Sequence, residues 1–176
     1  LLTRRCLELI DRYEFGVAVQ TKSARILRDF DLLTSINEKA KAIVQITLTT
    51  YDEDLCKKIE PDVSTTKERI DVLMKCKEAG IPTVVWLTPI LPFINDTADN
   101  IKNLLDACVD AGVKGIIFWG IGVTLRDGDR EYFYHALDKD FPGMKEKYIR
   151  TYGNAYNLPS PNEKMLIPMI VEQCQK

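Results

Sequence analysis

The sequence predicts an α/β fold, a partial (β/α) TIM-like barrel with about four parallel strands, flanking helices and further C-terminal helices. Apolar runs without polar gaps alternate with stretches whose apolar residues recur at helical spacing, as in a parallel sheet buried on both faces. The segments EAGIPTVVW (78–86) and DAGVKGIIFW (110–119) repeat one pattern about one strand–helix unit apart. Four units cannot close an eight-stranded barrel, so we expect an incomplete or open barrel, or a small open sheet.

The first half of the chain contains two predicted strands, each followed by helical segments. The expected order is a helix at 2–13, a strand at 15–20, a helix at 24–38 and a strand at 42–50. In the polar stretch that follows, Asp52 can cap a short helix that ends before Pro61. Thr65 and Glu68 then have the spacing of a capping box, which starts a helix that runs to Gly80.

The second half contains two more strands and then a helical tail. The expected strands are 82–89 and 115–120, and the expected helices are one between them, one at 128–138, one in FPGMKEKYIRTYG and a terminal one from 162. Asp96 or Thr97 caps the first of these helices, and Pro168 can kink the last. We expect residues 1–156 to form the barrel part, and 157–176 to form a linker (157–161) and a helix packing on it.

Composition places the chain among ordinary soluble globular domains. Its 176 residues fit one domain, with 45% hydrophobic and 28% charged residues. The net charge of −2 gives no overall basic field for nucleic acid or anionic lipid, and no apolar run reaches membrane-spanning length. No signal peptide is visible, so we expect a cytoplasmic protein without a membrane partner. Because the chain starts at Leu1 inside a helical pattern, we interpret it as a fragment.

The sequence offers little for metal, phosphate or acid–base chemistry. The five cysteines are Cys6, Cys56, Cys76, Cys108 and Cys174; none are close enough to form a metal-ligand pair, and we expect reduced, buried thiols. His135 is the only histidine, in a predicted helix, which argues against a Ser–His–Asp triad. No glycine-rich phosphate loop occurs, and the acidic clusters look like helix starts or solvated faces.

Polar side chains gather where the predicted strands end, and ligands of parallel α/β folds bind at these ends. The candidates are Thr21, Lys22 and Ser23, then Thr47, Thr49 and Thr50, then Thr88, Pro89, Asn95 and Asp96, and finally Trp119 and Gly120. Hydroxyls around one lysine suit a ligand with a carboxylate and a ribose. The alternative is that threonine is a strand former and that polar residues simply begin loops.

Ordered segments of the chain resemble a known family. They are LTRRCLELIDRYEFGVAVQTKSARILRDFDLL, ITLTTYDEDLCKKIEPDVSTTKERIDVL, EAGIPTVVWLTPILPFIND and, less strongly, REYFYHALDKDFPGMKEKY. Thr-Lys follows one strand, Glu-Pro and Glu-Arg-Ile follow the next, and Pro-Ile-x-Pro-x-x-Asn-Asp follows the third. In this order the segments resemble the spore photoproduct lyase-like (DNA repair photolyase-like) branch of the radical S-adenosylmethionine superfamily.

The resemblance implies a lyase-like enzyme whose complete barrel has six units, of which this chain is the C-terminal two-thirds. In such enzymes a [4Fe–4S] cluster held by a C-x3-C-x2-C run reductively cleaves S-adenosylmethionine, and the resulting radical abstracts hydrogen from the substrate. That cysteine run is absent here. We therefore expect this chain alone to bind neither cofactor and to be inactive. The substrate stays open, and nucleic acid is implied by the resemblance but not supported by the charge.

The resemblance also implies site residues. Lys22 matches the position that meets the methionine carboxylate, and Thr47 matches a Ser/Thr position at the cofactor. Thr49 is expected to bond the amino acid or ribose part, and Thr88 joins the set as a strand-end hydroxyl. Arg69 matches a common arginine position, with a purely structural role as the alternative. The catalytic residues stay unassigned, and no residue is predicted to bind a metal.

Two other functions remain open at this point. Lys22 can act as a Schiff-base nucleophile in an aldolase-like barrel, which needs an acid–base partner. The chain can also be a non-catalytic binding or scaffold half-barrel, which the missing cysteines favour. In either case the edge of the first strand is expected to be exposed and able to pair two chains into a dimer.

Overall fold

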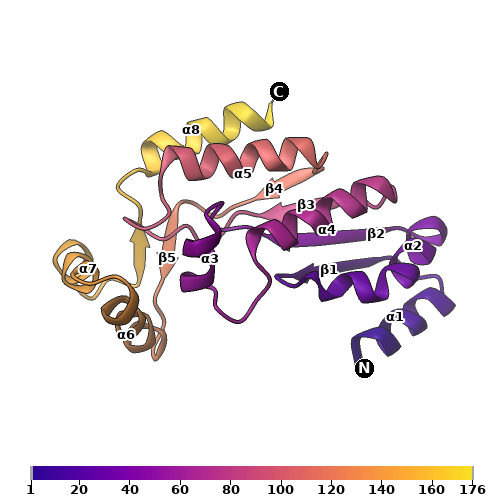
Figure 1. Ribbon diagram of the computed structural model, residues 1–176, viewed down its shortest axis with the longest axis horizontal. Helices are drawn as coiled ribbons and strands as arrows, with labels where there is room; N and C mark the ends of the chain where they lie inside the picture. Colours follow the sequence, from indigo (N-terminus) through magenta and orange to yellow (C-terminus); the bar gives the residue numbers. More distant parts are fainter. Residues whose placement is uncertain (1, 176) are drawn as a thin grey trace.

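The computed structural model describes residues 2–175 and has the predicted α/β architecture, a four-stranded parallel sheet flanked by helices (Figure 1). The sheet order is β1-β2-β3-β4, the sequence order. The strands are β1 (Val17–Thr21), β2 (Ala42–Thr47), β3 (Thr83–Trp86) and β4 (Gly115–Ile117). Thr47 pairs with Trp86, and Trp86 with Ile117, so the carboxyl ends of β2, β3 and β4 lie at one edge of the sheet.

Helices connect the strands and continue after them. They are α1 (Leu2–Arg12), the 3₁₀ helix η1 (Ala24–Asp29), α2 (Phe30–Lys39), α3 (Glu53–Ile59), α4 (Thr66–Glu78), α5 (Ala98–Asp110), α6 (Asp129–Asp140), α7 (Met144–Tyr152) and α8 (Glu163–Cys174). Figure 1 shows α8 lying along α5, while α6 and α7 form a separate pair at the far side of the molecule from α1. No helix within residues 2–175 combines the length and the apolar character needed to cross a membrane.

The main core lies between the sheet and its helices. Val44, Ile46 and Val85 are fully buried, since alternate residues of a strand point to the same face. Leu33, Ile36, Val72, Leu73, Ile101, Leu104, Leu166 and Ile170 of the covering helices belong to the same buried cluster. Because α8 contributes two of these side chains, the C-terminal helix is part of the main core.

The predicted helix starts are confirmed where the signal is local. The Asp52 side chain accepts a hydrogen bond from the Leu55 amide, and Thr65 and Glu68 form the predicted capping box. Of the two candidates for α5, Thr97 is the cap, since its side chain accepts from the Asn100 amide.

The helix expected over 24–38 is instead divided in two at Asp29. Asp29 is 2% exposed, and its carboxylate accepts hydrogen bonds from Arg28 and from Arg4 of α1. The 3₁₀ segment η1 ends at this residue, and α2 begins at the next. The sequence does not reveal this break, because it accompanies an ion pair with a residue 25 positions away.

The expected linker at 157–161 is wrong in part, because it contains a strand. Residues Asn157–Pro159 form β6, which pairs antiparallel with β5 (Gly122–Thr124). A Cβ atom at Gly122 would lie 2.4 Å from the Leu158 carbonyl oxygen, so only glycine allows this approach. The pair belongs to a second core with α6 and α7, in which the buried Tyr148 hydroxyl donates to the Pro92 carbonyl at 2.6 Å.

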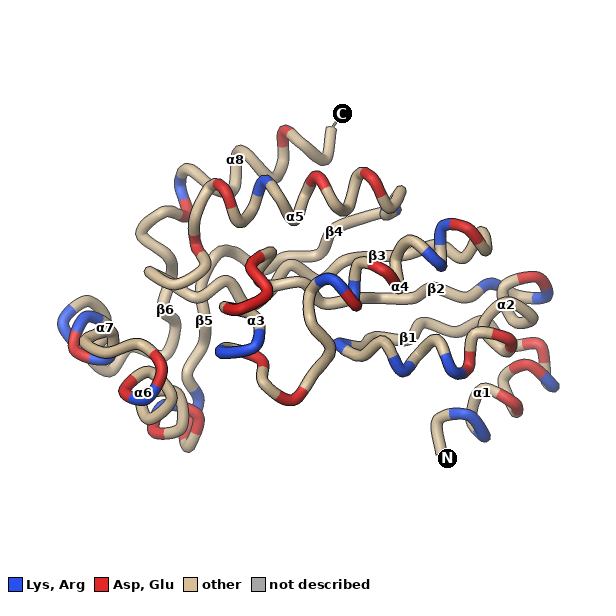
Figure 2. Tube along the Cα trace, viewed as in Figure 1, with Lys and Arg blue, Asp and Glu red and all other residues tan. Residues whose placement is uncertain are grey.

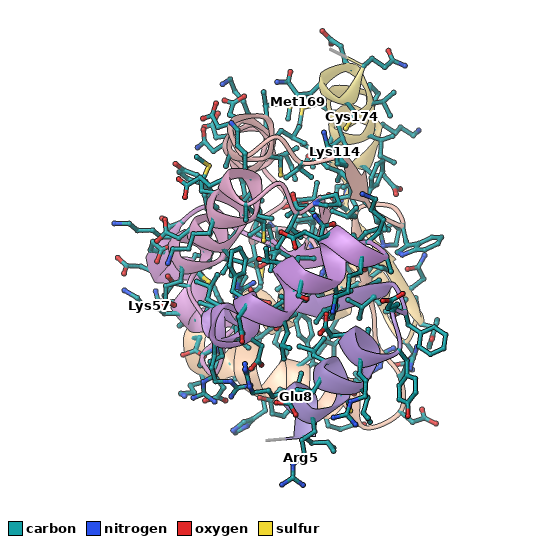
Figure 3. The ribbon with its side chains drawn as sticks, turned by 90° about the vertical axis from the view of Figure 1, so that its right-hand side faces the viewer. Arg5, Glu8, Lys57, Lys114, Met169 and Cys174 are labelled. Carbon is teal, nitrogen blue, oxygen red and sulfur yellow. The ribbon has the colours of Figure 1, made fainter. Side chains whose placement is uncertain are left out.

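The expectation that all five thiols are reduced and buried is confirmed for three. No disulfide occurs among the described residues; Cys56, Cys76 and Cys108 are buried, whereas Cys6 and Cys174 are exposed. On α1 the buried residue is Leu7, and its neighbour Cys6 points about 100° away around the helix. Figure 3 shows the Cys174 end of α8, and Arg5 and Glu8 at the α1 end of the molecule.

Candidate functional site

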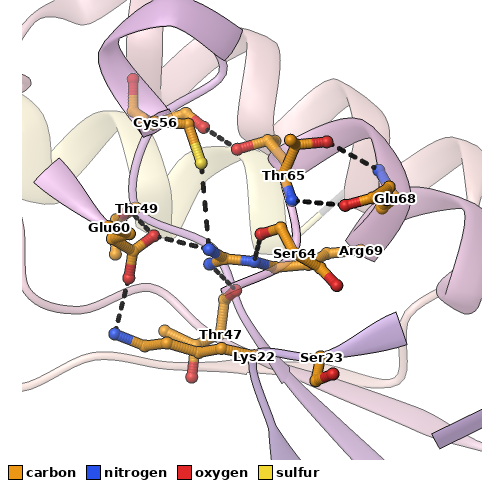
Figure 4. A network of polar contacts seen from close by, with 12 residues as sticks. Lys22, Ser23, Thr47, Thr49, Cys56, Glu60, Ser64, Thr65, Glu68 and Arg69 are labelled. Atoms are coloured by element: carbon orange, nitrogen blue, oxygen red, sulfur yellow. Dashed lines mark hydrogen bonds and ion pairs between the residues drawn. The ribbon is translucent and has the colours of Figure 1, made fainter. Parts of the chain in front are cut away.

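The Thr-Lys, Glu-Pro and Glu-Arg-Ile motifs converge at the carboxyl ends of β1 and β2 (Figure 4). Lys22 directly follows β1, Glu60 caps the C-terminus of α3, and Arg69 lies in the first turns of α4. The Lys22 Nζ atom is 2.6 Å from Glu60 Oε1, and an Arg69 guanidinium nitrogen is 2.8 Å from Glu60 Oε2. Thr49 adds a hydrogen bond from its hydroxyl to Glu60 Oε2 at 2.9 Å.

Arg69 is the buried centre of this network. Its side chain is 0% exposed. Its guanidinium donates to the Ser64 carbonyl at 2.7 Å and to the Thr47 carbonyl at 3.0 Å, in addition to the ion pair with Glu60. Arg69 thus has no exposed surface, and its guanidinium contacts groups inside the protein. These contacts agree with the alternative, a structural role for Arg69, and its direct contact with a cofactor stays a prediction.

Glu60 is the residue of this network that was missing from the candidate set. Its only signal was the Glu-Pro step in the family-like segment, next to two lysines that look like a solvated helix end. Burial alone would raise the pKa of the Glu60 carboxyl, but hydrogen bonding and charge from Lys22, with Arg69 and Thr49, lower it overall. Glu60 is thus held ionised between two cations.

The network leaves one positive charge unbalanced, because Lys22 and Arg69 share the single carboxylate of Glu60. Arg69 is buried, whereas the Lys22 side chain is 36% exposed. Lys22 therefore presents the charge of the network to a ligand. A carboxylate or another anion is the group that such a site favours.

A cavity of about 440 Å³ opens beside Lys22. On the network side it is lined by Lys22, Thr49, Glu60 and the loop after β3, and on the opposite side by α6. The α6 wall includes Phe133, Leu137 and the exposed His135. Figure 2 shows α3 with its acidic start and its basic end, and Lys58 of that end also lines the cavity. The cavity is thus largely apolar, with a few charged side chains of both signs, as is typical of ligand pockets.

The predicted hydroxyls are not all at this cavity. Thr49 lines it, but Thr47 is 4% exposed and contributes its main-chain carbonyl to Arg69. Thr50 is 1% exposed, and its hydroxyl has no hydrogen-bond partner among the described residues. Thr88 lines a neighbouring cavity together with Trp119. The single ring of hydroxyls expected from the sequence is therefore divided between two cavities and the protein interior.

The Asn-Asp pair after β3 fixes loops and lines neither of these two cavities. The buried Asn95 amide donates to the Thr49 carbonyl at 2.8 Å, which ties the loops after β2 and β3 together. Asp96 accepts a hydrogen bond from Ser160, and its main-chain carbonyl accepts one from Asn162 at 2.9 Å. Burial raises the pKa of the Asp96 carboxyl despite the hydrogen bond from Ser160. Both side chains hold the neighbouring loops in place.

Within residues 2–175 the structure brings together no group of three His, Cys, Asp or Glu side chains that could hold a metal ion. The residues described here thus do not fit an iron–sulfur cluster.

No protein-family model matches the chain. An uncharacterized protein of Mycobacterium tuberculosis is 25% identical over 150 residues, which cover 85% of this chain and 44% of that protein. An uncharacterized protein of Acidianus two-tailed virus is 32% identical over 149 residues, covering 80% of this chain and 48% of that protein. One of Methanocaldococcus jannaschii is 34% identical over 95 residues, covering 54% and 35%. The chain thus spans half or less of the length of these relatives.

The fold is similar to that of a solved structure. A domain of pyruvate-formate lyase-activating enzyme from Bacteroides vulgatus superposes with a TM-score of 0.54 over 78% of this chain and 84% of that domain. The sequence identity is 13%, so the likeness concerns the fold alone.

Proposed function

We propose that this chain is the part of a radical S-adenosylmethionine enzyme, of the spore photoproduct lyase-like branch, that holds the amino acid end of the cofactor. The observation that carries the proposal is the network of Figure 4, in which Lys22 comes from one family-like segment and Glu60 and Arg69 come from the next. The shared fold adds support, because pyruvate-formate lyase-activating enzyme is itself a radical S-adenosylmethionine enzyme.

Lys22 is the residue that we assign to the methionine carboxylate. It is the exposed cation of a network with one unbalanced positive charge, and it lies at the cavity. The same ligand carries an α-ammonium group, and the ionised Glu60 beside Lys22 can accept it. A zwitterionic amino acid can thus match Lys22 with its carboxylate and Glu60 with its ammonium group.

The remaining predicted residues act behind this contact. Thr49 and Arg69 orient the Glu60 carboxylate by their hydrogen bond and ion pair, and the Thr47 carbonyl orients Arg69 in turn. When bound, S-adenosylmethionine supplies hydrogen abstraction from a substrate, with electrons from a [4Fe–4S] cluster. The cluster ligands do not come from the described residues, and we place them in another part of a longer protein.

The geometry of Lys22 disfavours the Schiff-base alternative. Its amino group is engaged at 2.6 Å in an ion pair with the mostly buried Glu60 carboxylate, and an ion-paired ammonium group has no lone pair for attack on a carbonyl. No observation specifically favours a scaffold role.

The test is S-adenosylmethionine binding and cleavage by the complete protein, purified without oxygen and reconstituted with iron and sulfide. Lys22→Ala should weaken binding about tenfold or more, since a charge-assisted contact contributes about 1–3 kcal/mol. Lys102→Ala is the matched control, because Lys102 is ion-paired with Asp106 on α5, away from the cavity. We expect a brown protein that releases 5′-deoxyadenosine with dithionite. A colourless protein that leaves the cofactor intact, or unchanged affinity in Lys22→Ala, would refute the proposal.

A further inference from the structure

A second cavity, of about 420 Å³, lies beside the first at the carboxyl ends of β3 and β4. Pro89 and Val123 line both cavities, so the two adjoin. The second one is enclosed by residues that follow β3 and β4, by the β5–β6 pair and by the start of α8. Thr88, a candidate from the sequence, lines this cavity, but the proposed cofactor function uses none of its lining residues.

Trp119 is the unusual side chain of this cavity, because it is 80% exposed. The other tryptophan, Trp86, is half-buried and donates its indole N–H to Gln45 at 2.7 Å. Trp119 makes no hydrogen bond and no ring contact with any residue in the described part of the chain. Single exposed apolar residues are common on protein surfaces, so its exposure gains meaning only from what lies beside it.

Beside it lies a carboxylate held by the main chain. Glu163 accepts a hydrogen bond from the Ile121 amide at 3.2 Å through Oε1, which leaves Oε2 for another donor. Gly120 has a φ of +90°, and a Cβ atom there would lie 2.9 Å from Glu163 Oε1. The glycine thus lets the chain after Trp119 turn directly against this carboxylate. The cavity therefore combines a free aromatic face with an acceptor at its edge.

We propose that this second cavity binds a planar heterocycle that presents adjacent N–H donors, the pattern of guanine. The ring stacks on Trp119, and its N–H edge donates to Glu163. Adenine and cytosine place an acceptor nitrogen next to their amino group, and this lone pair would face the carboxylate. Guanine presents two neighbouring donors instead, so the carboxylate distinguishes it from the other bases. This inference goes beyond the proposed cofactor site and does not depend on it.

Tryptophan fluorescence of the 176-residue chain tests the proposal directly. In Trp86→Phe all tryptophan emission comes from Trp119, and in Trp119→Phe it comes from Trp86. Guanosine monophosphate should quench the first variant saturably and leave the second unchanged. Inosine monophosphate, which lacks one donor, should bind more weakly. Adenosine monophosphate should bind at least about tenfold more weakly than the guanine nucleotide.

Calorimetry measures binding of the same nucleotides without relying on tryptophan fluorescence. Trp119→Ala and Glu163→Gln should each weaken guanosine monophosphate binding about tenfold, whereas Glu146→Gln on α7 should leave it unchanged. Circular dichroism checks that each variant is folded. A short oligothymidine strand that contains one guanine is compared with free guanosine monophosphate. Tighter binding of the strand would identify the ligand as a nucleic acid strand, and equal affinity would identify it as a free nucleotide. Absence of saturable quenching, equal affinity for all three nucleotides, or unchanged affinity in folded Trp119→Ala would overturn the proposal. None of these readouts involves Lys22, so this proposal and the cofactor proposal can fail separately.

Discussion

Replacing Arg69 by leucine tests whether the buried guanidinium holds the site together. The substitution removes the charge that faces Glu60 and leaves the carbonyls of Ser64 and Thr47 without their donor. We expect the free energy of unfolding to fall substantially, because the Arg69 side chain and the groups that it contacts lie in the protein interior.

The magnitude follows from the contacts that are lost. Removing one partner of a buried ion pair costs about 3–5 kcal/mol, because the remaining charge is left buried. Lys22 still pairs with Glu60 from the partly exposed side, which reduces the cost, while two unpaired carbonyls add to it. We therefore expect Arg69→Leu to destabilise the chain by about 3 kcal/mol.

Urea unfolding followed by circular dichroism measures this loss for Arg69→Leu, Glu60→Gln and the double variant. Since the two side chains contact each other, the double variant should lose at least about 1 kcal/mol less than the sum of the single variants. Arg5→Leu, at an exposed position of α1, is the control and should change stability by no more than about 0.5 kcal/mol. A loss below about 1 kcal/mol for Arg69→Leu, or strict additivity with Glu60→Gln, would refute the reasoning.

Three further predictions concern pH, packing and thiol chemistry. Folding lowers the pKa of Glu60, so the ionised carboxylate stabilises the protein above pH 4.5, the ordinary pKa, and this stabilisation is lost as the pH falls through the pKa of the folded state. The difference in unfolding free energy between wild type and Glu60→Gln should therefore shrink in acid. A difference that stays constant with pH would contradict this. Tyr148→Phe should lower the free energy of unfolding by about 1–2 kcal/mol, because loss of the hydroxyl leaves the buried Pro92 carbonyl without its donor. An unchanged urea midpoint would contradict this prediction. Burial raises the pKa of Cys76 to about 11 and of Cys108 to about 12. A thiol reagent should therefore label the exposed Cys6 and Cys174 before these two in the native protein, as mass spectrometry can show, and equal labelling rates would argue against this packing.

The sequence predicts the parts of the fold whose cause is local. The cap at Asp52 and the capping box of Thr65 and Glu68 depend on residues three positions apart, so spacing reveals them. The four strands of the main sheet are recognisable because buried parallel strands are apolar on both faces. The observed strands are shorter than predicted, because the chain turns into polar loops where hydrogen bonding between the strands stops.

Features with a distant cause escape such reasoning. The β5–β6 pair consists of two three-residue strands, and its formation depends on the close approach of Gly122 to Leu158, far along the chain. Glu60 looks like a solvated helix end until packing places it between Lys22 and Arg69. For the same reason Arg69, predicted as a cofactor contact, proves to be buried beneath that carboxylate.

The burial of Arg69 also determines how the site can respond to a ligand. One guanidinium bonds to main-chain or side-chain atoms from β2, α3 and the loop before α4, so these segments hold their places without any ligand. A ligand at Lys22 then meets a preorganised surface and loses little affinity to the ordering of loops. The same connection couples these three segments. A local opening that frees Arg69 releases Glu60, Ser64 and Thr47 from it together, so the carboxylate beside Lys22 loses its buried anchor while the rest of the sheet remains folded.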